Sequence, residues 1–166
     1  MPTLDNLKAA FAGESQANRK YLAFAKQAED EGKPQIARLF RAAAEAETVH
    51  AHAHLRAMKG IGTTAQNVQA AIEGEHYEFV EMYPTFLEEA RREGHHDAAR
   101  SFEYALAVEQ VHHRLYTKAA EALQKGQDLP AASIFVCPVC GNTEVGARPD
   151  RCDICGVPGS RFVEIH

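Results

Sequence analysis

The chain has 166 residues, enough for one domain of typical size and a small appendage. Hydrophobic residues make up 45% and charged residues 25%, and the net charge of −5 leaves no basic surface for a nucleic acid. No apolar stretch approaches the length of about 18 residues that a membrane-spanning helix needs, and the N-terminus lacks a signal-peptide pattern. We therefore expect a cytoplasmic protein with no nucleic-acid partner and no membrane contact.

Helical periodicity runs through the first three quarters of the chain. Gly32 and Pro34 separate the first helix from the second, because Gly ends helices and Pro favours the first turn of the next. Thr63 or Thr64 can cap the third helix, and Gly94 can end it. The expected helices cover residues 4–31, 35–58, 65–93 and 96–125.

The second helical hairpin repeats the first. The spacing from Gly32 to Glu47 is 15 residues, and so is the spacing from Gly94 to Glu109. Two similar hairpins with short internal turns predict an all-α four-helix bundle of the ferritin-like kind, with halves related by pseudo-twofold symmetry.

The repeat slips by one residue in the third helix. Glu14 and Tyr21 are seven residues apart, whereas their counterparts Glu75 and Tyr83 are eight apart. A helix absorbs one extra residue most simply as a single π-helical turn, a feature that often occurs at functional sites. We predict such a turn between Glu75 and Tyr83, and a local kink at Pro84.

The remainder of the chain has a different character. The pattern divides the protein into a bundle at 1–127, a linker at 128–133 and a small cysteine-rich domain at 134–166. Short β-prone pieces occur at 134–136 and 161–165. A domain of about 30 residues buries too little apolar surface to fold alone, so a bound metal must stabilise it.

Two Glu-x-x-His motifs, at Glu47 with His50 and at Glu109 with His112, place a carboxylate and an imidazole on one face of a helix. Carboxylates inside a bundle are costly unless a cation neutralises them. Two divalent ions, iron or manganese by the oxygen-rich ligand set, would satisfy them. The alternative is a set of exposed glutamates, although solvated charges have no reason to follow the repeat. The candidate ligands are Glu14, Glu47, His50, Glu75, Glu78, Glu109 and His112.

All four cysteines lie near the C-terminus in two C-x-x-C pairs. This spacing predicts one tetrathiolate metal site formed by Cys137, Cys140, Cys152 and Cys155. The spacing alone leaves structural zinc and redox-active iron open. Disulfides are disfavoured in a reducing compartment.

These motifs, in this order, are similar to those of the rubrerythrins over nearly the full length of the chain. The resemblance implies a di-iron bundle joined to a rubredoxin-like domain whose single iron is held by four thiolates. It also implies a non-haem peroxidase that reduces hydrogen peroxide to water in oxidative-stress defence. The residues that carry the resemblance are Gly13-Glu14 with Tyr21, Glu47-x-x-His50, Gly74-Glu75-His76-Tyr77-Glu78, Met82-Tyr83-Pro84, Glu109-x-x-His112 and Cys137-Pro-x-Cys140.

The resemblance assigns a role to each ligand. Glu47 and Glu109 would bridge the two irons. Glu14 would be a terminal ligand of the first iron, and Glu75 with His112 would be terminal on the second.

The remaining ligands would differ between redox states. The family resemblance implies that the first iron exchanges His50 for Glu78 on oxidation, while His112 stays bound. Tyr21 and Tyr83 would orient the carboxylates from outside the ligand set.

Three other functions stay open at this stage. They are an oxygen-consuming ferroxidase, a protein that binds or stores iron or manganese without turnover, and a structural bundle with a zinc ribbon. As partners we expect hydrogen peroxide, a redox donor such as rubredoxin, ferredoxin or a reductase, and a second copy of the chain. That homodimer would be arranged head to tail or with exchanged helices.

Overall fold

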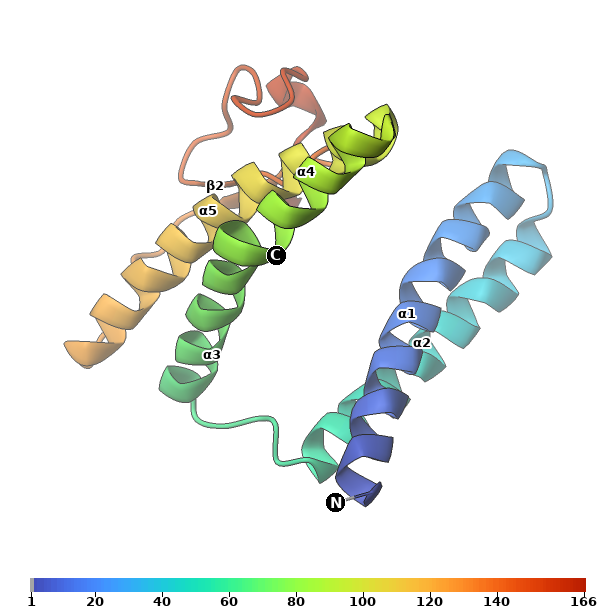
Figure 1. Cartoon of the computed structure of the whole chain (residues 1–166), viewed down its shortest axis with the longest axis horizontal. Helices are drawn as coiled ribbons and strands as arrows, with labels where there is room; N and C mark the ends of the chain where they lie inside the picture. Colours follow the sequence, from blue (N-terminus) through green and yellow to red (C-terminus); the bar gives the residue numbers. More distant parts are fainter. Residues whose placement is uncertain (1) are drawn as a thin grey trace. The chain divides into compact units, whose positions relative to one another are not determined.

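The computed structural model describes residues 2–166. The chain divides into two compact units, with the boundary between Gly62 and Thr63. The first unit is a helical hairpin. The second contains further helices and a small β-sheet (Figure 1). Within the described residues, no helix is long and apolar enough to cross a membrane.

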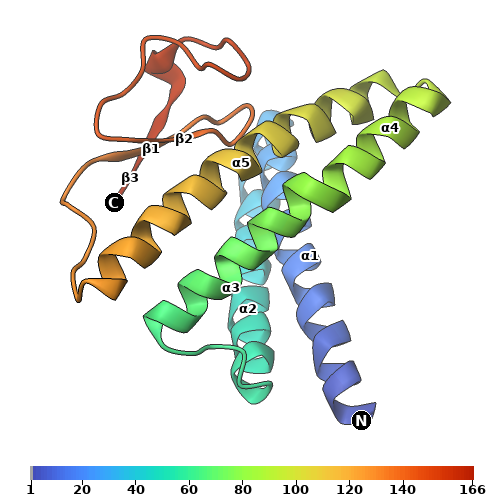
Figure 2. The same ribbon diagram turned by 60° about the vertical axis from the view of Figure 1, so that its left-hand side comes forward.

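The first unit consists of α1 (Pro2–Asp30) and α2 (Pro34–Ala57), which lie side by side in both ribbon views (Figures 1 and 2). Small residues make up the buried seam between them. Ala37, Ala44 and Ala51 of α2 recur every seven residues and are at most 6% exposed. A heptad repeat of small side chains keeps one stripe of α2 against α1 along its length. The hairpin therefore fixes the relative position of side chains on its two helices.

The second unit begins with a long, interrupted helix. α3 (Thr64–Tyr77) leads into the π-helical turn η1 (Glu78–Met82) and then α4 (Tyr83–Glu93), and α5 (His96–Gln124) packs against all three. The π-helical turn predicted from the extra residue is confirmed. Pro84 lies in the first turn of α4, and Figure 1 shows the helix axis changing direction between α3 and α4.

The helix ends follow the signals in the sequence. Thr63 is the N-cap of α3, and its hydroxyl accepts a bond from the backbone N–H of Gln66, whose side chain in turn accepts one from the Thr63 N–H. This reciprocal capping box satisfies two otherwise unpaired donors. Gly94 ends α4 in the left-handed conformation, at φ 78°. The expected helix boundaries agree with the observed ones to within two residues.

The C-terminal segment forms a three-stranded antiparallel sheet in the order β2-β1-β3, next to α5 (Figure 2). β1 (Ile134–Val136) matches the prediction, and β3 (Val163–Ile165) covers the end of the predicted 161–165 segment. β2 (Thr143–Val145) was not predicted. The sheet is small, and the buried hydrophobic cluster of this domain consists of Phe135, Cys137, Cys152 and Phe162.

The internal repeat is visible in the packing of each hairpin. An exposed ion pair joins Glu29 to Arg41 in the first unit, and another joins Arg91 to Glu103 in the second, with the charges exchanged between helices. Aromatic contacts repeat as well. Each unit has one Tyr and two Phe in ring contact: Tyr21, Phe24 and Phe40 in the first, and Tyr83, Phe86 and Phe102 in the second.

Candidate metal centres

In the first unit, Glu14 of α1 and Glu47 with His50 of α2 form one cluster. Their ligand atoms all lie within 4.8 Å of one another. His50 Nδ1 is 2.9 Å from the Glu47 carboxylate, as the Glu-x-x-His spacing requires. The His50 side chain is 56% exposed, whereas that of Glu47 is only 18% exposed. The cluster therefore lies at the surface of the hairpin, with its imidazole outermost.

Beside this cluster, Asn18 ties the two helices together. It is 8% exposed, and its side-chain amide donates to the Ala44 carbonyl at 2.7 Å and to the Thr48 hydroxyl at 2.8 Å. Asn18 is four residues after Glu14, and Thr48 is next to Glu47, so the bond holds the backbones that carry these two carboxylates.

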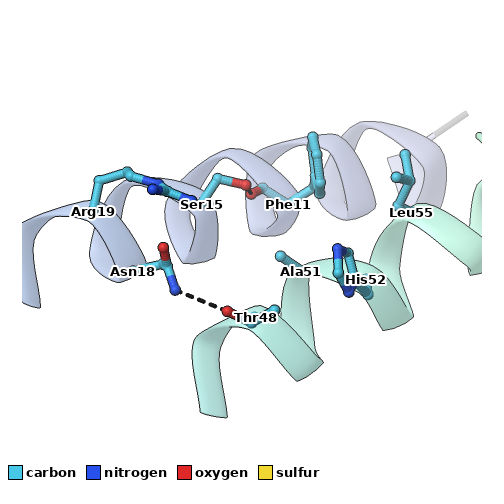
Figure 3. A pocket seen from close by; sticks show the side chains of 8 residues that line it. All are labelled: Phe11, Ser15, Asn18, Arg19, Thr48, Ala51, His52 and Leu55. Atoms are coloured by element: carbon cyan, nitrogen blue, oxygen red, sulfur yellow. Dashed lines mark hydrogen bonds between the residues drawn. The ribbon is translucent and has the colours of Figure 1, made fainter. Parts of the chain in front are cut away.

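A hollow of about 210 Å³ lies between α1 and α2 (Figure 3). Its lining includes Phe11, Arg19, His52 and Leu55, but no acidic side chain. None of the predicted ligands contributes to it. The hollow is therefore separate from the carboxylate cluster of this unit.

In the second unit, Glu75 of α3 and Glu109 with His112 of α5 form the corresponding cluster, again with ligand atoms within 4.8 Å. His112 Nδ1 is 2.8 Å from the Glu109 carboxylate and 3.7 Å from that of Glu75. All three side chains are between 15% and 28% exposed. This cluster is more enclosed than its counterpart.

The carboxylates of the second unit are crowded. Burial, together with a hydrogen bond and the charge of Glu109, raises the pKa of Glu75 to about 8. Burial and the charge of Glu109 also raise the pKa of Glu78. Glu78 lies on the π-helical turn and is not part of the three-residue cluster. Burial and the nearby Glu78 raise the pKa of the Tyr83 phenol. Without a cation, this site favours the protonated forms.

The donor set of each cluster fits a hard or borderline divalent metal. Each cluster offers two carboxylates and one imidazole, which suits iron or manganese better than a thiophilic metal. A divalent cation would also offset the charge repulsion that raises the pKa of Glu75.

The four cysteines come together as predicted. The sulfurs of Cys137 and Cys155 are 3.5 Å apart, and so are those of Cys140 and Cys152. A disulfide bond would need about 2.05 Å. A tetrahedral site with metal–sulfur bonds of about 2.3 Å requires sulfurs about 3.8 Å apart. The arrangement therefore fits one metal ion and no disulfide.

The backbone of each cysteine loop supports thiolate ligands. Burial opposes ionisation of Cys152, but the backbone N–H groups of Cys155 and Ile154 outweigh it and lower its pKa to about 7. Burial raises the pKa of Cys140 far above its usual value, and it also raises that of Cys155. The protein thus favours one thiolate, and a cation must bind before four thiolates can coexist.

Comparisons with known proteins agree with this combination of sites. Residues 5–120 match the sequence model of the rubrerythrin family. The chain is 36% identical to rubrerythrin-2 of Clostridium acetobutylicum, an alignment that covers 96% of this chain and 95% of that protein. It is 32% identical to the rubrerythrin of Nitratidesulfovibrio vulgaris, covering 96% and 92% of the two chains. The chain belongs to the rubrerythrin family.

The structure resembles a rubrerythrin relative as well. Nigerythrin in a partially reduced state superposes with a TM-score of 0.60 and 34% identity, covering 98% of this chain and 86% of that one. This likeness confirms the predicted fold class, a four-helix bundle followed by a small three-stranded domain with four clustered cysteines.

The structure brings together most of the residues predicted from the rubrerythrin resemblance. Glu14, Glu47 and His50 form one cluster in the first unit. The second unit contains two separate clusters, the four cysteines and the group of Glu75, Glu109 and His112. Glu78 stays outside both clusters. Tyr83 lies close enough to the carboxylates of its unit for their charges to act on its phenol. The role of each residue in catalysis stays a prediction.

Two residues with structural roles at these sites were not predicted. Asn18 looks like any polar residue of an amphipathic helix, and only its burial between α1 and α2 shows its role. Thr143 belongs to no motif of the C-terminal segment, yet its Oγ1 is 3.0 Å from His112 Nε2. No motif in the sequence indicates either contact.

The raised pKa of Glu75 predicts a pH-dependent release of protons. In the metal-free protein the folded pKa of about 8 exceeds the ordinary value of 4.5. The folded state therefore holds more protons than the unfolded state between these values, and stability falls as the pH rises from 4.5 to 8. Metal uptake at pH 7 should release about one proton from Glu75, and almost none above pH 9.

Calorimetric titration of Zn²⁺ into the metal-free protein, in two buffers with different ionisation enthalpies, measures the total number of protons released, which includes those from the cysteines, and the difference between wild type and variant gives the proton of Glu75. A Glu75→Gln variant is the control, because it has no proton to release at this position. Equal proton release by the variant and the wild type at pH 7 would refute the assignment.

Proposed function

We propose that this rubrerythrin is a non-haem di-iron peroxidase that reduces hydrogen peroxide to water. The observation that carries the proposal is the pair of matching clusters, each with two carboxylates and one imidazole, in repeated positions of the chain. A relative of known structure, nigerythrin, has been solved in a fully reduced, all-ferrous state. Its 34% identity to this chain supports iron as the metal here.

In this proposal the two clusters provide the ligands of one di-iron centre. Glu47 and Glu109 would bridge, and the more enclosed His112 would stay bound. The imidazole of His50 is more exposed than that of His112, so His50 is the better candidate for the ligand that Glu78 would replace on oxidation. Two ferrous ions would supply Lewis acidity and two electrons to the peroxide.

Other residues of the chain would control charge around the centre. The raised pKa keeps the Tyr83 phenol protonated near the carboxylates, so its hydroxyl can donate to them without adding negative charge. Tyr21 occupies the repeat-related position and contacts Phe24 and Phe40, as Tyr83 contacts Phe86 and Phe102. We infer that both tyrosines orient carboxylates.

Electrons would return through an iron held by the four cysteines. A one-electron carrier is useful beside a two-electron reaction because it restores the ferrous state in single steps. The external donor would be a rubredoxin, a ferredoxin or a reductase in the cytoplasm. Metal analysis with an absorption spectrum of the purified protein tests the metals: the proposal predicts a red protein with three irons per chain. A colourless protein with zinc would refute it and favour the structural ribbon.

We also propose that the protein acts as a homodimer, head to tail or with exchanged helices. A complete set of ligands needs both units, which can come from one chain or from two. Co-expression of Glu47→Gln and Glu109→Gln chains separates these cases. With exchanged helices, a mixed dimer has one intact centre and one doubly altered centre, so peroxide reduction returns. Without exchange, every centre in the mixed dimer keeps one lesion and activity stays absent.

A further inference from the structure

The C-terminal domain touches α5 at the position of the predicted metal ligand His112. Thr143, the first residue of β2, has its hydroxyl 3.0 Å from His112 Nε2. One turn earlier on α5, a side chain added to Gly141 would contact Val108, which is only 3% exposed. The contact with Thr143 is therefore part of a packed interface within the second unit.

Hydrogen-bond directions at Thr143 follow from its second partner. The same hydroxyl donates to the carbonyl of Gly141 at 3.3 Å. A carbonyl can only accept, so the single hydroxyl proton points to Gly141 and a lone pair of Oγ1 faces the imidazole. In that arrangement the lone pair accepts a hydrogen bond from the N–H group at His112 Nε2. The nitrogen that remains for a cation is Nδ1, which lies 2.8 Å from the Glu109 carboxylate and 3.7 Å from that of Glu75.

We propose that Thr143 is a positioning residue that fixes the Nε2–H tautomer of His112 and aims Nδ1 at the metal site. This inference deepens the proposed function and rests on it for the identity of the metal. Histidine ligands generally need a partner on the other ring nitrogen, and loss of such a partner typically lowers metal affinity by about 10- to 100-fold. Here that partner is Thr143, which belongs to the domain that carries the cysteines and follows Cys140 by three residues.

The repeat provides an internal comparison. His50 holds the matching position in the first unit, and its Nδ1 also faces a carboxylate, that of Glu47. Across residues 2–166, however, the structure shows no protein partner for Nε2 of His50, and its side chain is 56% exposed. The two imidazoles thus differ by one hydrogen bond. An anchored His112 and an unanchored His50 explain how one of two repeat-related ligands can stay bound while the other leaves.

The test uses the full-length protein and three side chains at position 143. Thr143→Val keeps the shape of the side chain but removes the hydroxyl, whereas Thr143→Ser keeps the hydroxyl. Long-range proton–nitrogen correlation spectra of the histidines report whether Nε2 of His112 carries a proton in the metal-free protein, and which tautomer is present in the Zn²⁺-loaded protein. Zn²⁺ titrations report the affinity of the Glu75, Glu109 and His112 cluster, and binding to the cysteines shows that the C-terminal domain is folded.

We expect Thr143→Val to lose the uniform Nε2–H tautomer and to bind Zn²⁺ about 10- to 100-fold more weakly at the carboxylate cluster. Thr143→Ser should restore both, and all three proteins should fill the cysteine site equally. A Thr143→Val protein with wild-type tautomer and affinity would overturn the inference. A wild type that takes up no cation at the carboxylates would refute the metal centre instead, while its tautomer spectra would still decide the role of Thr143.

Discussion

Replacing Glu109 by Gln is expected to lower the metal affinity of the carboxylate sites by on the order of 100-fold or more, since loss of an outer partner of a ligand already costs about 10- to 100-fold. Peroxide reduction should fall with it. Glu109 is 15% exposed and lies 2.8 Å from His112, and its charge contributes to the raised pKa of Glu75. The substitution keeps the size of the side chain but removes the charge that a cation needs.

The same change should not weaken the fold of the metal-free protein. Above pH 8 the ionised Glu75 no longer faces the charge of Glu109 in the variant, so metal-free Glu109→Gln should melt at the same temperature as metal-free wild type or higher. Calorimetry on both proteins measures this. A lower melting temperature of metal-free Glu109→Gln than of metal-free wild type would mean that Glu109 stabilises the fold and is not a metal ligand.

Glu103→Gln is the matched control for this experiment. Glu103 lies on the same helix, but its carboxylate is 45% exposed and pairs with Arg91 at the surface. Such pairs contribute about 0–1 kcal/mol to stability. The control should therefore bind metal and reduce peroxide like the wild type.

Replacing Cys152 by Ser is expected to lower the rate of donor-driven peroxide reduction by on the order of 100-fold or more. The reason is that the proposed redox iron loses one of its four ligands and no longer binds. Cys152 is 2% exposed and lies in the small core with Phe135, Cys137 and Phe162. Its backbone partners favour the thiolate, which a serine hydroxyl cannot replace as a ligand.

The optical bands of the proposed di-iron centre should persist in the Cys152→Ser variant, since the carboxylates and histidines that would bind it are unchanged. Val139→Ser is the control, because Val139 lies between the two cysteines of the other C-x-x-C loop, is not a ligand and is 44% exposed. Full turnover by Cys152→Ser with the donor would show that electrons do not pass through the cysteine site.

The helices and the ligand clusters could be predicted because both depend on local periodicity. Residues three apart on a helix share a face, so Glu109 and His112 had to lie together once the helix formed. The extra residue before Tyr83 likewise had a local solution, the π-helical turn at Glu78–Met82. In these cases the spacing along the chain determines the geometry.

The contacts that the sequence did not predict depend on packing between distant segments. β2 is a three-residue strand whose only signal is its pairing with β1, a contact that no local pattern encodes. Thr143 reaches His112 across 31 residues because the C-terminal domain packs on α5. Asn18 reaches Ala44 across 26 residues for a similar reason, the close approach of α1 and α2.

In the proposed reaction, the protein reduces peroxide with electrons from a donor. The most direct measurement counts electrons: the iron-loaded protein is supplied anaerobically with a reduced rubredoxin-type donor and hydrogen peroxide, while donor oxidation, peroxide loss and dioxygen are followed together. We expect two donor electrons to be consumed for each peroxide, with water as product and no dioxygen released. Peroxide left intact while the protein oxidises added ferrous ions with dioxygen would contradict it and identify a ferroxidase.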